Sequence, residues 1–234
     1  GVSTRLIGAL IMAHSDDNGL VLPPKIAPAH LALIPIYRDE HERDLVMEFC
    51  QRIEKLFAKT YLDDIRIFTE LDDRDLTSSE RNWYWIKKGI PIRIEIGPRD
   101  VSQGAVMVAR RDHEPRDKQS IAIDELCSHV IETLQEMQQG YYQKALSFRQ
   151  ENTIQLDNKD DFYRFFTPEN TDQPEIHGGF ASSHWCGNTA CEEKIKDDLK
   201  VTIRCIPFDA TPEPGECIAC GMPSQRRVIF AKSY

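Results

Sequence analysis

The hydrophobic positions between residues 30 and 111 follow a period of two in several short segments. In IPIRIEIG, Arg93 and Glu95 lie on one side and the other side is apolar, formed by Ile90, Ile92, Ile94 and Ile96. This alternation predicts a β-strand with one polar face. The apolar run HLALIPI at 30–36 predicts a buried strand. Two further strands are expected in DIRIFTE and GAVMVARR.

A helical period separates these strands. After Arg38 and Asp39, apolar residues recur at the spacing of a helix that ends near Lys59, namely Leu45, Phe49, Ile53 and Leu56. The segment RNWYWIKKG predicts a second, shorter helix that ends at Gly89. Strands and helices in this order predict an α/β fold with a mixed sheet.

The regions on either side of this pattern differ from it. The opening run GVSTRLIGAL has no helix cap and has the pattern of an interrupted strand, followed by an expected turn in AHSDDNGL. Near the other end, a helical pattern from about Ser120 to Asn152, weakened at Gly140, precedes expected strands in VTIRCIPF and RVIFAKSY. These changes, with the prolines between Pro23 and Pro28, predict three domains, at 1–28, 29–119 and 120–234.

Four cysteines occur as two close pairs in the last of these domains. The spacing is C-x4-C for Cys186 and Cys191 and C-x2-C for Cys217 and Cys220. Thiolates at such spacing are typical of a closed, tetrahedral Zn²⁺ site with a structural role. The alternative is four buried or disulfide-paired cysteines. His184 could replace one thiolate, but four cysteines leave it no vacancy.

The remaining cysteines and the composition add limits. Cys50, Cys127 and Cys205 lie at apolar positions of helix or strand patterns, so we expect them to be small core residues. The unpaired spacings do not suggest a secreted disulfide framework and favour a reducing compartment. The formal net charge of −9 argues against broad, non-specific binding of nucleic acid. No apolar run reaches the roughly 18 residues that would span a membrane.

Four segments together resemble one family, the prolyl-tRNA synthetases of the eukaryote/archaeon-like type. The first 28 residues resemble the class II motif 3 and its exit, and IPIRIEIGPRD resembles the signature of the anticodon-binding domain. The cysteine pairs resemble the zinc site of the family's C-terminal domain, and FAKSY resembles its chain end. The resemblance implies an anticodon-binding domain at 29–119 and an α+β zinc-binding domain at 120–234, after the tail of a catalytic domain.

The resemblance also assigns residues to the synthetase active site. Arg5 matches the motif 3 arginine that binds ATP, a substrate that enters such sites with Mg²⁺, and Ser3 and Thr4 lie beside it. Arginine suits this role because its fork of donors is always charged. Without the family, Arg5 would be interpreted as a surface or capping arginine. The terminal carboxylate of Tyr234 is expected to be directed toward the active site.

The resemblance places anticodon recognition in the α/β domain. Guanine favours arginine or lysine at O6 and N7, carboxylates at its other edge, and stacking on aromatic rings. The matching residues are Trp85, Arg93, Arg99 and Asp100. Residues 81–118 hold nine basic and five acidic side chains, which can contact phosphates or form a solvated face. The family commonly has an acidic residue where Ile86 stands, so its role could shift to Glu80.

Three functions remain open at this point. The first is the C-terminal part of a proline–tRNA ligase, an enzyme that forms prolyl-tRNA from proline, ATP and tRNA(Pro). This part is expected to be inactive without the catalytic half of the enzyme. The family implies a cytoplasmic homodimer that pairs through the catalytic domain and does not bind a membrane. The second is a non-catalytic tRNA-binding module. The third is a structural zinc module that contacts proteins and has no tRNA preference.

Overall fold

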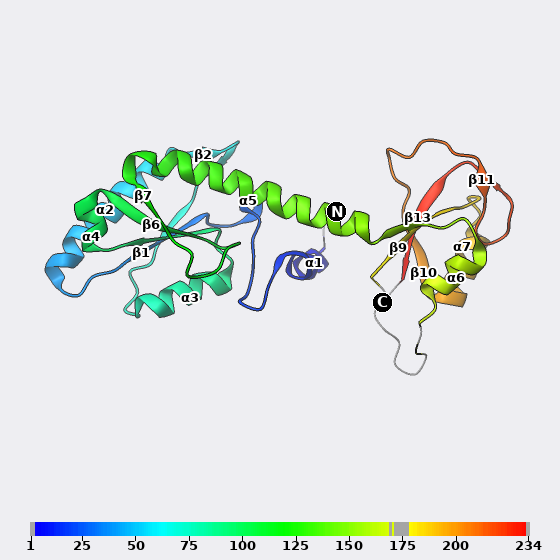
Figure 1. The fold of residues 1–234 in the computed structure, drawn as a ribbon, viewed down its shortest axis with the longest axis horizontal. Helices are drawn as coiled ribbons and strands as arrows, with labels where there is room; N and C mark the ends of the chain where they lie inside the picture. Colours follow the sequence, from blue (N-terminus) through cyan, green and yellow to red (C-terminus); the bar gives the residue numbers. More distant parts are fainter. Residues whose placement is uncertain (1–2, 169, 171–177, 233–234) are drawn as a thin grey trace. The chain divides into compact units, whose positions relative to one another are not determined.

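The computed structural model describes residues 3–168, 170 and 178–232. The chain divides into two compact units, Gly1–Ala145 and Leu146–Tyr234. Each unit has its own sheet and its own hydrophobic core. The two units are described one after the other (Figure 1).

The first unit begins with a helix where a strand was expected. α1 spans Arg5–His14 and buries none of its residues. Several of its apolar side chains are exposed, namely Leu6, Ile7, Ile11 and Met12. The strand prediction was wrong because a short apolar run does not distinguish a strand from a helix. The expected turn follows at Asp16–Gly19, and the prolines lead into a short 3-10 helix, η1, at Pro24–Ile26.

The sheet of the first unit has five strands in the order β4-β1-β5-β6-β7. β1 (Leu31–Pro35) pairs in parallel with β4 (Thr69–Leu71) and with β5 (Ile92–Ile96). The next two strands, β6 (Ala105–Arg110) and β7 (Gln119–Ala122), are antiparallel to their neighbours. The sheet is therefore mixed, as predicted.

Part of the segment DIRIFTE forms a small hairpin outside this sheet. β2 (Tyr61–Leu62) pairs with β3 (Ile65–Arg66), and β4 then begins at Thr69. The expected single strand is therefore divided between the hairpin and the edge of the main sheet.

The two predicted helices of this unit form with clear end signals. α2 spans Glu40–Phe57, and the side chain of Asp39 caps it by accepting a hydrogen bond from the backbone N–H of Glu42 at 2.9 Å. α3 spans Ser78–Lys88 and starts in a capping box of Thr77 and Glu80. Gly89 ends α3 in the left-handed conformation, with φ of 75°.

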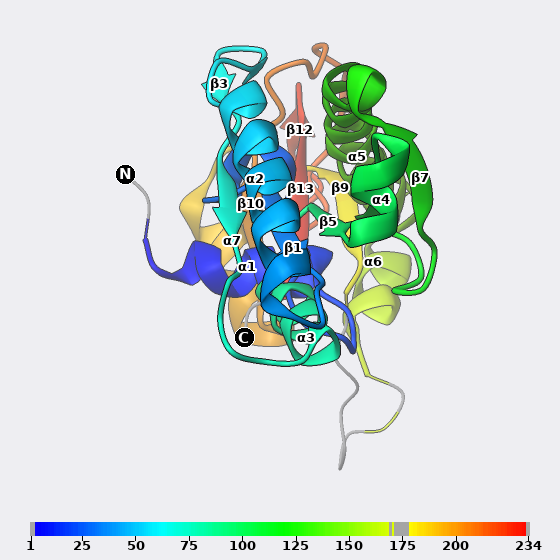
Figure 2. The ribbon, with the colours of Figure 1, turned by 90° about the vertical axis from the view of Figure 1, so that its left-hand side faces the viewer.

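The segment that follows β5 forms a third, short helix. α4 spans Pro98–Gln103, with proline in its first turn. The carboxylate of Asp100 accepts a hydrogen bond from the backbone N–H of Gly97 at 2.8 Å. Figure 2 shows α2 and α4 in the foreground of this unit.

The long helix α5, Ile123–Glu151, changes the expected domain boundary. It is one helix that continues through Gly140. Side chains along its first two thirds are buried in the core of the first unit, including Leu126, Val130, Leu134 and Met137. The compact unit ends later than the boundary predicted between residues 119 and 120, because this helix covers the sheet that precedes it. The compact unit extends to Ala145.

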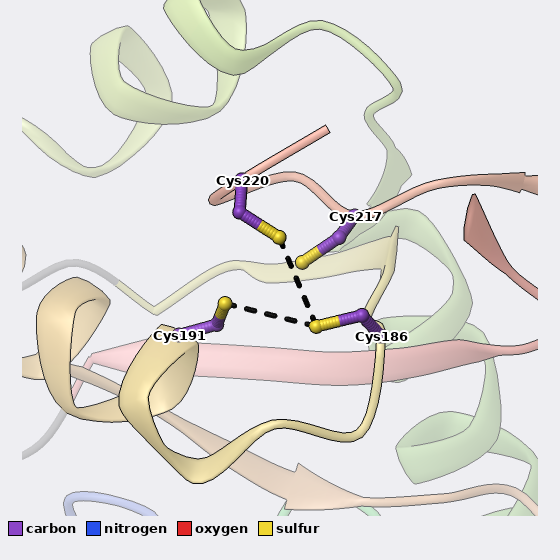
Figure 3. Close-up of side chains that lie close together, drawn as sticks. All are labelled: Cys186, Cys191, Cys217 and Cys220. Carbon is purple, nitrogen blue, oxygen red and sulfur yellow. Dashed lines mark hydrogen bonds between the residues drawn. The ribbon is translucent and has the colours of Figure 1, made fainter. Parts of the chain in front are cut away.

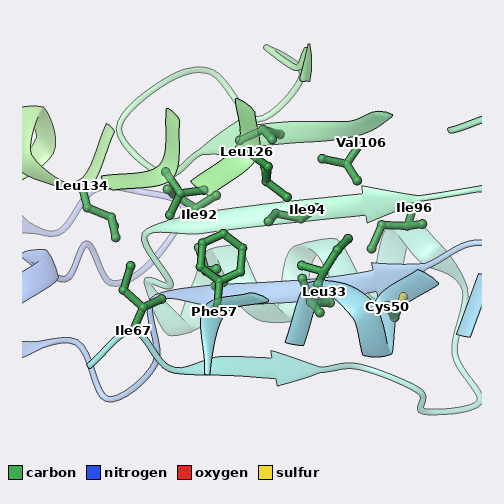
Figure 4. Packing of buried hydrophobic residues seen from close by; sticks show 14 of the residues in the cluster. Leu33, Cys50, Phe57, Ile67, Ile92, Ile94, Ile96, Val106, Leu126 and Leu134 are labelled. Atoms are coloured by element: carbon green, nitrogen blue, oxygen red, sulfur yellow. The ribbon is translucent and has the colours of Figure 1, made fainter. Parts of the chain in front are cut away.

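The core of the first unit lies on one face of its sheet. The isoleucines of β5 point toward side chains of α2 and α5 (Figure 4), as do Leu33 of β1 and Val106 of β6. The opposite face is covered by α3, where Trp85 packs against Ala32 and Ile90. The central strands β1 and β5 are therefore buried on both faces.

The second unit has a four-stranded sheet in the order β10-β13-β9-β8. The two predicted strands form as β10 (Val201–Cys205) and β13 (Arg227–Lys232), while β8 (Thr153–Gln155) and β9 (Phe180–His184) were not predicted. Two helices, α6 (Lys159–Phe166) and α7 (Thr189–Leu199), and the short hairpin β11–β12 (Gly215–Glu216 with Pro223–Ser224) complete it.

The predicted core cysteines lie in different environments. Cys50 is buried in the first unit, and Cys127 is half-buried against the same core. Cys205 is exposed, so its expected role as a core residue was wrong. It lies at the end of β10, where the pairing with β13 shifts register.

Candidate metal centre and nucleic-acid surface

The structure brings together the four cysteines that the spacing singled out (Figure 3). All four Sγ atoms lie within 4.8 Å of one another. The sulfur of Cys186 is 3.7 Å from that of Cys191 and 3.8 Å from that of Cys220. A tetrahedron with metal–sulfur bonds of about 2.3 Å has sulfur–sulfur edges of about 3.8 Å. The cluster therefore has the size and the donor set of a site that could hold a metal ion.

The first cysteine pair is held by a strand end and a helix start. Cys186 lies just after β9, and Cys191 lies in the first turn of α7. Asn188 caps this helix by accepting a hydrogen bond from the backbone N–H of Ala190 at 2.9 Å. Gly187 has a φ of 86°, the left-handed conformation that turns the chain between the two cysteines.

The second pair lies in the loop between β11 and β12. The backbone N–H of Gly221 donates to the carbonyl of Cys217 at 2.8 Å, and the N–H of Cys217 donates to the carbonyl of Met222 at 2.8 Å. These bonds form a tight turn that carries Cys217 and Cys220 on one side. Gly221, like Gly187, has a left-handed conformation, with a φ of 73°.

The surroundings of Cys217 favour its thiolate. Burial opposes ionisation, but hydrogen bonds from the backbone N–H groups of Cys220, Ala219 and Cys186 outweigh it and lower the pKa of the Cys217 thiol to about 7. Burial raises the pKa of Cys191. A thiolate is the form of cysteine that binds metals, so the backbone around Cys217 favours the form that a metal ion would bind.

His184 supports the cluster from outside it. Its side chain is buried, with Nδ1 lying 3.4 Å from the hydroxyl of Ser224, and its carbonyl accepts a hydrogen bond from the N–H of Ile218 at 3.0 Å. It is not among the grouped ligands. The cysteine group is therefore complete with its four sulfurs.

Arg93 lies on the polar face that the alternation predicted for its strand, and this face is buried. The side chain is 1% exposed. Its guanidinium donates to the side-chain oxygen of Asn82 at 3.1 Å and to the carbonyl of Pro115 at 3.4 Å. Burial lowers its pKa to about 10. The polar side of β5 is covered by α3 and by the loop after β6, so Arg93 joins these elements inside the protein.

Trp85 lies on α3 in a surface region where hydrogen bonds and ring contacts hold the side chains in place. Its indole N–H donates to the carboxylate of Asp72 at 2.8 Å, and Asp72 also accepts two hydrogen bonds from the guanidinium of Arg74, at 2.8 and 2.6 Å. Arg74 in turn lies 3.8 Å above the ring of Tyr84. Tyr84 is 38% exposed and Trp83 is 42% exposed. This stack was not predicted from the sequence, although the run WYW contains its aromatic ring.

Arg99 and Asp100 lie on α4. Arg99 is exposed, while the carboxylate of Asp100 is engaged with the backbone N–H of Gly97. Within the described residues, no hydrogen bond or ion pair joins any two of the four predicted anticodon residues. The structure therefore brings the cysteines together and distributes the anticodon candidates over α3, β5 and α4.

Position 86 does not face solvent in this chain. Ile86 is 2% exposed, and its carbonyl accepts a hydrogen bond from Arg111 at 3.0 Å. Glu80, the suggested substitute, has its carboxylate bound to the backbone N–H and the hydroxyl of Thr77 at 2.9 and 2.7 Å. The hydrogen bonds from Thr77 lower the pKa of Glu80. Its carboxylate therefore already caps α3.

Several basic residues of 81–118 are held by partners inside the first unit. Arg111 is buried and donates to both carboxylate oxygens of Asp16 at 2.8 and 2.6 Å. Arg110 pairs with Asp112 and Glu136, and Lys118 pairs with Glu95. The basic side chains of this stretch that remain exposed, apart from Lys118, are Lys87, Lys88, Arg99 and Arg116. The cationic surface is smaller than the sequence count indicates.

The residues assigned to ATP lie at the start of α1. Ser3, Thr4 and Arg5 are all exposed. Thr4 is the N-cap residue of α1, with no hydrogen bond from its side chain to the helix. The hydroxyls and the guanidinium are thus open to solvent here. Tyr234 lies outside the described residues.

Comparison with known sequences matches a different family to each of the two compact units. Residues 30–133 match the family described as the anticodon binding domain, and residues 172–234 match the family described as the C-terminal domain of prolyl-tRNA synthetase. Over its full length the chain is 46% identical to the proline–tRNA ligase 2 of Anaeromyxobacter dehalogenans. Over its full length, the chain is therefore similar to the C-terminal half of proline–tRNA ligases.

Other relatives give the same alignment. The chain is 43% identical to the proline–tRNA ligase of Bdellovibrio bacteriovorus and 40% identical to that of Protochlamydia amoebophila, again over its full length. It spans 46% of the length of each of these three synthetases, and it matches their C-terminal half.

The family assignments correspond to the geometry. The anticodon-binding match covers the mixed sheet and the helices on its faces, and it ends within α5. The prolyl-tRNA synthetase C-terminal match contains all four clustered cysteines. None of the described helices is both long enough and apolar enough to span a membrane.

Proposed function

We propose that the chain is the tRNA-recognising part of a proline–tRNA ligase, which converts ATP, proline and tRNA(Pro) to prolyl-tRNA, AMP and diphosphate. The observation that carries the proposal is full-length similarity, at 40–46% identity, to proteins that bear this name. The anticodon-binding match of the first unit supports the choice of tRNA as partner. The complete enzyme is cytoplasmic, and it forms a homodimer through contacts between its catalytic domains.

The first unit recognises the guanines of the proline anticodon. Arg99 is exposed and can donate to guanine O6 and N7, and Asp100 stands beside it to accept from the opposite edge. Trp85 and Tyr84 line a hollow of about 240 Å³ together with Lys88, where an unstacked base can lie against an aromatic ring. Arg93 acts as a positioning residue, because its buried guanidinium holds α3 and the loop after β6.

The second unit holds a structural Zn²⁺. Cys186, Cys191, Cys217 and Cys220 are its ligands, and their number and spacing suit a closed tetrahedral site. Zinc bound in this way supplies a crosslink between two loops and leaves no position for substrate. The protein's own part is to position the four sulfurs through the turns at Gly187 and Gly221.

The start of the chain contributes to the ATP site of the full enzyme. Arg5 pairs with the nucleotide phosphates, whose charge Mg²⁺ also neutralises, while Ser3 and Thr4 donate hydroxyl hydrogen bonds to the adenylate. The carboxylate of Tyr234 positions groups in the same site. Most of that site comes from the half of the relatives that this chain does not match. The chain alone therefore does not aminoacylate tRNA.

Binding of labelled tRNA(Pro), measured by fluorescence anisotropy at fixed salt, tests the anticodon role. Replacing an anticodon guanine should weaken binding by about 1–3 kcal/mol. Arg99→Ala should reduce this discrimination, whereas Arg149→Ala, an exposed arginine of α5, should not. Equal binding to both tRNAs would contradict anticodon recognition and would favour the non-specific tRNA-binding module.

A fusion tests the enzymatic part. Joined to the N-terminal half of the Anaeromyxobacter relative, the chain should charge tRNA(Pro) with proline. Arg5→Ala should lower the rate of ATP-dependent proline activation in this fusion and leave tRNA affinity unchanged. A fusion that folds and binds tRNA but does not activate proline would favour the non-catalytic module.

A further inference from the structure

The four clustered sulfurs come from two separate segments of the chain. The first cysteine segment, residues 184–191, and the second cysteine segment, residues 215–224, each carry two of them. The sulfurs of Cys186 and Cys220 lie 3.8 Å apart across the two segments (Figure 3). This distance is about one edge of a tetrahedron of four thiolates around zinc. The contacts that hold the two segments at this spacing therefore set the geometry of the site.

Two hydrogen bonds join the segments independently of the cysteine side chains. The backbone N–H of Ile218 donates to the carbonyl of His184 at 3.0 Å. The hydroxyl of Ser224 donates to the carbonyl of Trp185, the residue that precedes Cys186, at 2.8 Å. The second bond depends on a side chain, so a single substitution can remove it and leave all four ligands in place.

Ser224 is buried where the second cysteine segment meets the first. It is 4% exposed, and it pairs with Gly215 in the β11–β12 hairpin. Its hydroxyl oxygen accepts a hydrogen bond from the N–H of Arg226 at 3.3 Å and lies 3.0 Å from the carbonyl of the same residue. A hydroxyl has one proton to donate, and the carbonyl of Trp185 is the closer acceptor. The hydroxyl therefore links the two segments.

The backbone of Trp185 is held at both of its polar groups. Its carbonyl accepts from Ser224, and its N–H donates to the carbonyl of Arg226 at 3.4 Å. The carbonyl belongs to the peptide group that joins Trp185 to Cys186. Its orientation therefore fixes the direction in which the side chain of Cys186 leaves the backbone.

The hairpin of the second segment lies directly against the ring of His184. This ring is 3% exposed, and its Nδ1 atom is 3.4 Å from the hydroxyl of Ser224. A Cβ atom at Gly215 would lie 2.3 Å from Nε2 of the ring, far inside contact distance. Close packing and hydrogen bonds thus fix the same spacing between the two segments.

We propose that Ser224 is a positioning residue of the metal centre, because its hydroxyl holds the peptide group before Cys186 in place against the second cysteine segment. The inference rests on the structural Zn²⁺ proposed above. Substitution of residues that hydrogen-bond around metal ligands typically weakens metal binding by about 10- to 100-fold. Ser224→Ala removes the hydroxyl and leaves the carbonyl of Trp185 without this donor.

Binding of Co²⁺ and Zn²⁺ to the complete chain tests the inference. Co²⁺ held by four thiolates in a tetrahedron absorbs visible light, and displacement of Co²⁺ by Zn²⁺ then gives the affinity for zinc. Ser224→Ala should bind both metals about 10- to 100-fold more weakly than the parent. Its Co²⁺ absorption bands should also differ, because these bands report the arrangement of the sulfurs, which a general loss of stability would not change.

Ser183→Ala is the matched control. Ser183 is another buried serine of the second unit, but its hydroxyl oxygen makes no hydrogen bond among the described residues. This variant should keep the metal affinity and the Co²⁺ spectrum of the parent. If Ser224→Ala folds only with metal, the rate at which a chelator removes Zn²⁺ from the loaded protein replaces the affinity, and release faster than from the loaded parent is expected.

The outcomes separate this inference from the proposal on which it rests. Equal affinity, spectrum and release rate in Ser224→Ala and the parent would overturn the positioning role and leave the zinc site in place. Equal losses in Ser224→Ala and Ser183→Ala would also overturn it, since any buried hydroxyl would then matter as much. A parent chain that binds neither metal would overturn the zinc site itself, and this inference with it.

Discussion

The two units of the chain are stabilised by different means. In the first unit, apolar side chains of α2 and α5 cover one face of a mixed sheet, and the core consists of aliphatic and aromatic residues together with Cys50, which is not part of the cysteine cluster. In the second unit, Cys191 and Cys217 are themselves core residues and pack among Phe162, Phe166 and Phe230. The proposed metal site therefore lies within the core of the second unit. Loss of the metal should unfold the second unit and leave the first unit folded.

Removal of the metal should have the largest effect. Metal binding to structural zinc sites contributes about 10–16 kcal/mol in small domains, so a chelator should unfold the second unit. Cys186→Ser should have the same effect. Amide hydrogen exchange resolved by segment measures this, with fast exchange expected in β9, α7 and β13 and unchanged protection in β1 and β5.

The control for this experiment is Cys127→Ser, which changes a half-buried cysteine of the first unit. It should leave the second unit intact. Full protection of β9 and β13 after chelation would show that the metal does not hold this unit.

A substitution that leaves a cavity in the first core should have the opposite effect: it should destabilise the first unit and leave the second unit intact. Phe57 is fully buried between α2 and the sheet, and Phe57→Ala should destabilise the first unit by about 3–5 kcal/mol. Urea unfolding followed by segment-resolved hydrogen exchange should place this loss between residues 21 and 141. An equal loss of protection in the second unit would mean that the two units unfold as one.

Loss of the ion pair between Asp16 and Arg111 should have a smaller effect on the free energy of unfolding, and this effect should depend on pH. The hydrogen bond from Arg111 is the main cause that lowers the pKa of Asp16. A lowered pKa in the folded state stabilises the fold above the unfolded value of about 3.9, and this contribution is lost as the pH falls through the folded pKa.

Asp16→Asn should therefore cost about 1 kcal/mol at neutral pH, since Asp16 is partly exposed. This loss of stability should become smaller as the pH falls below the unfolded pKa of about 3.9. Thermal unfolding of the variant and the parent between neutral and acidic pH measures the difference in stability. A stability difference that stays constant with pH would contradict the assigned ion pair.

Sequence patterns predicted those features that depend on local periodicity and spacing. The alternation around Ile94 predicted β5, the helical period after Asp39 predicted α2, and Gly89 predicted the end of α3. The two cysteine pairs predicted the cluster, because two short loops each carry two ligands and the fold only has to bring two loops together.

Features that depend on distant segments were not predictable. Arg93 lies on the polar side of its strand as expected, but α3 and the loop after β6 cover that side. Residues 126–141 belong to the first core because α5 packs on its sheet, which no local signal shows. β9 was missed because FASSH, small and polar, lacks an apolar period although it pairs with both β13 and β8.

The central claim is that the first unit recognises the anticodon without help from the metal-dependent second unit. The most direct test is the ratio of dissociation constants for tRNA(Pro) and its guanine-replaced form, measured by anisotropy before and after chelation at the same salt concentration. The account predicts that the ratio stays the same while hydrogen exchange reports an unfolded second unit. A ratio that falls to one on chelation would contradict it.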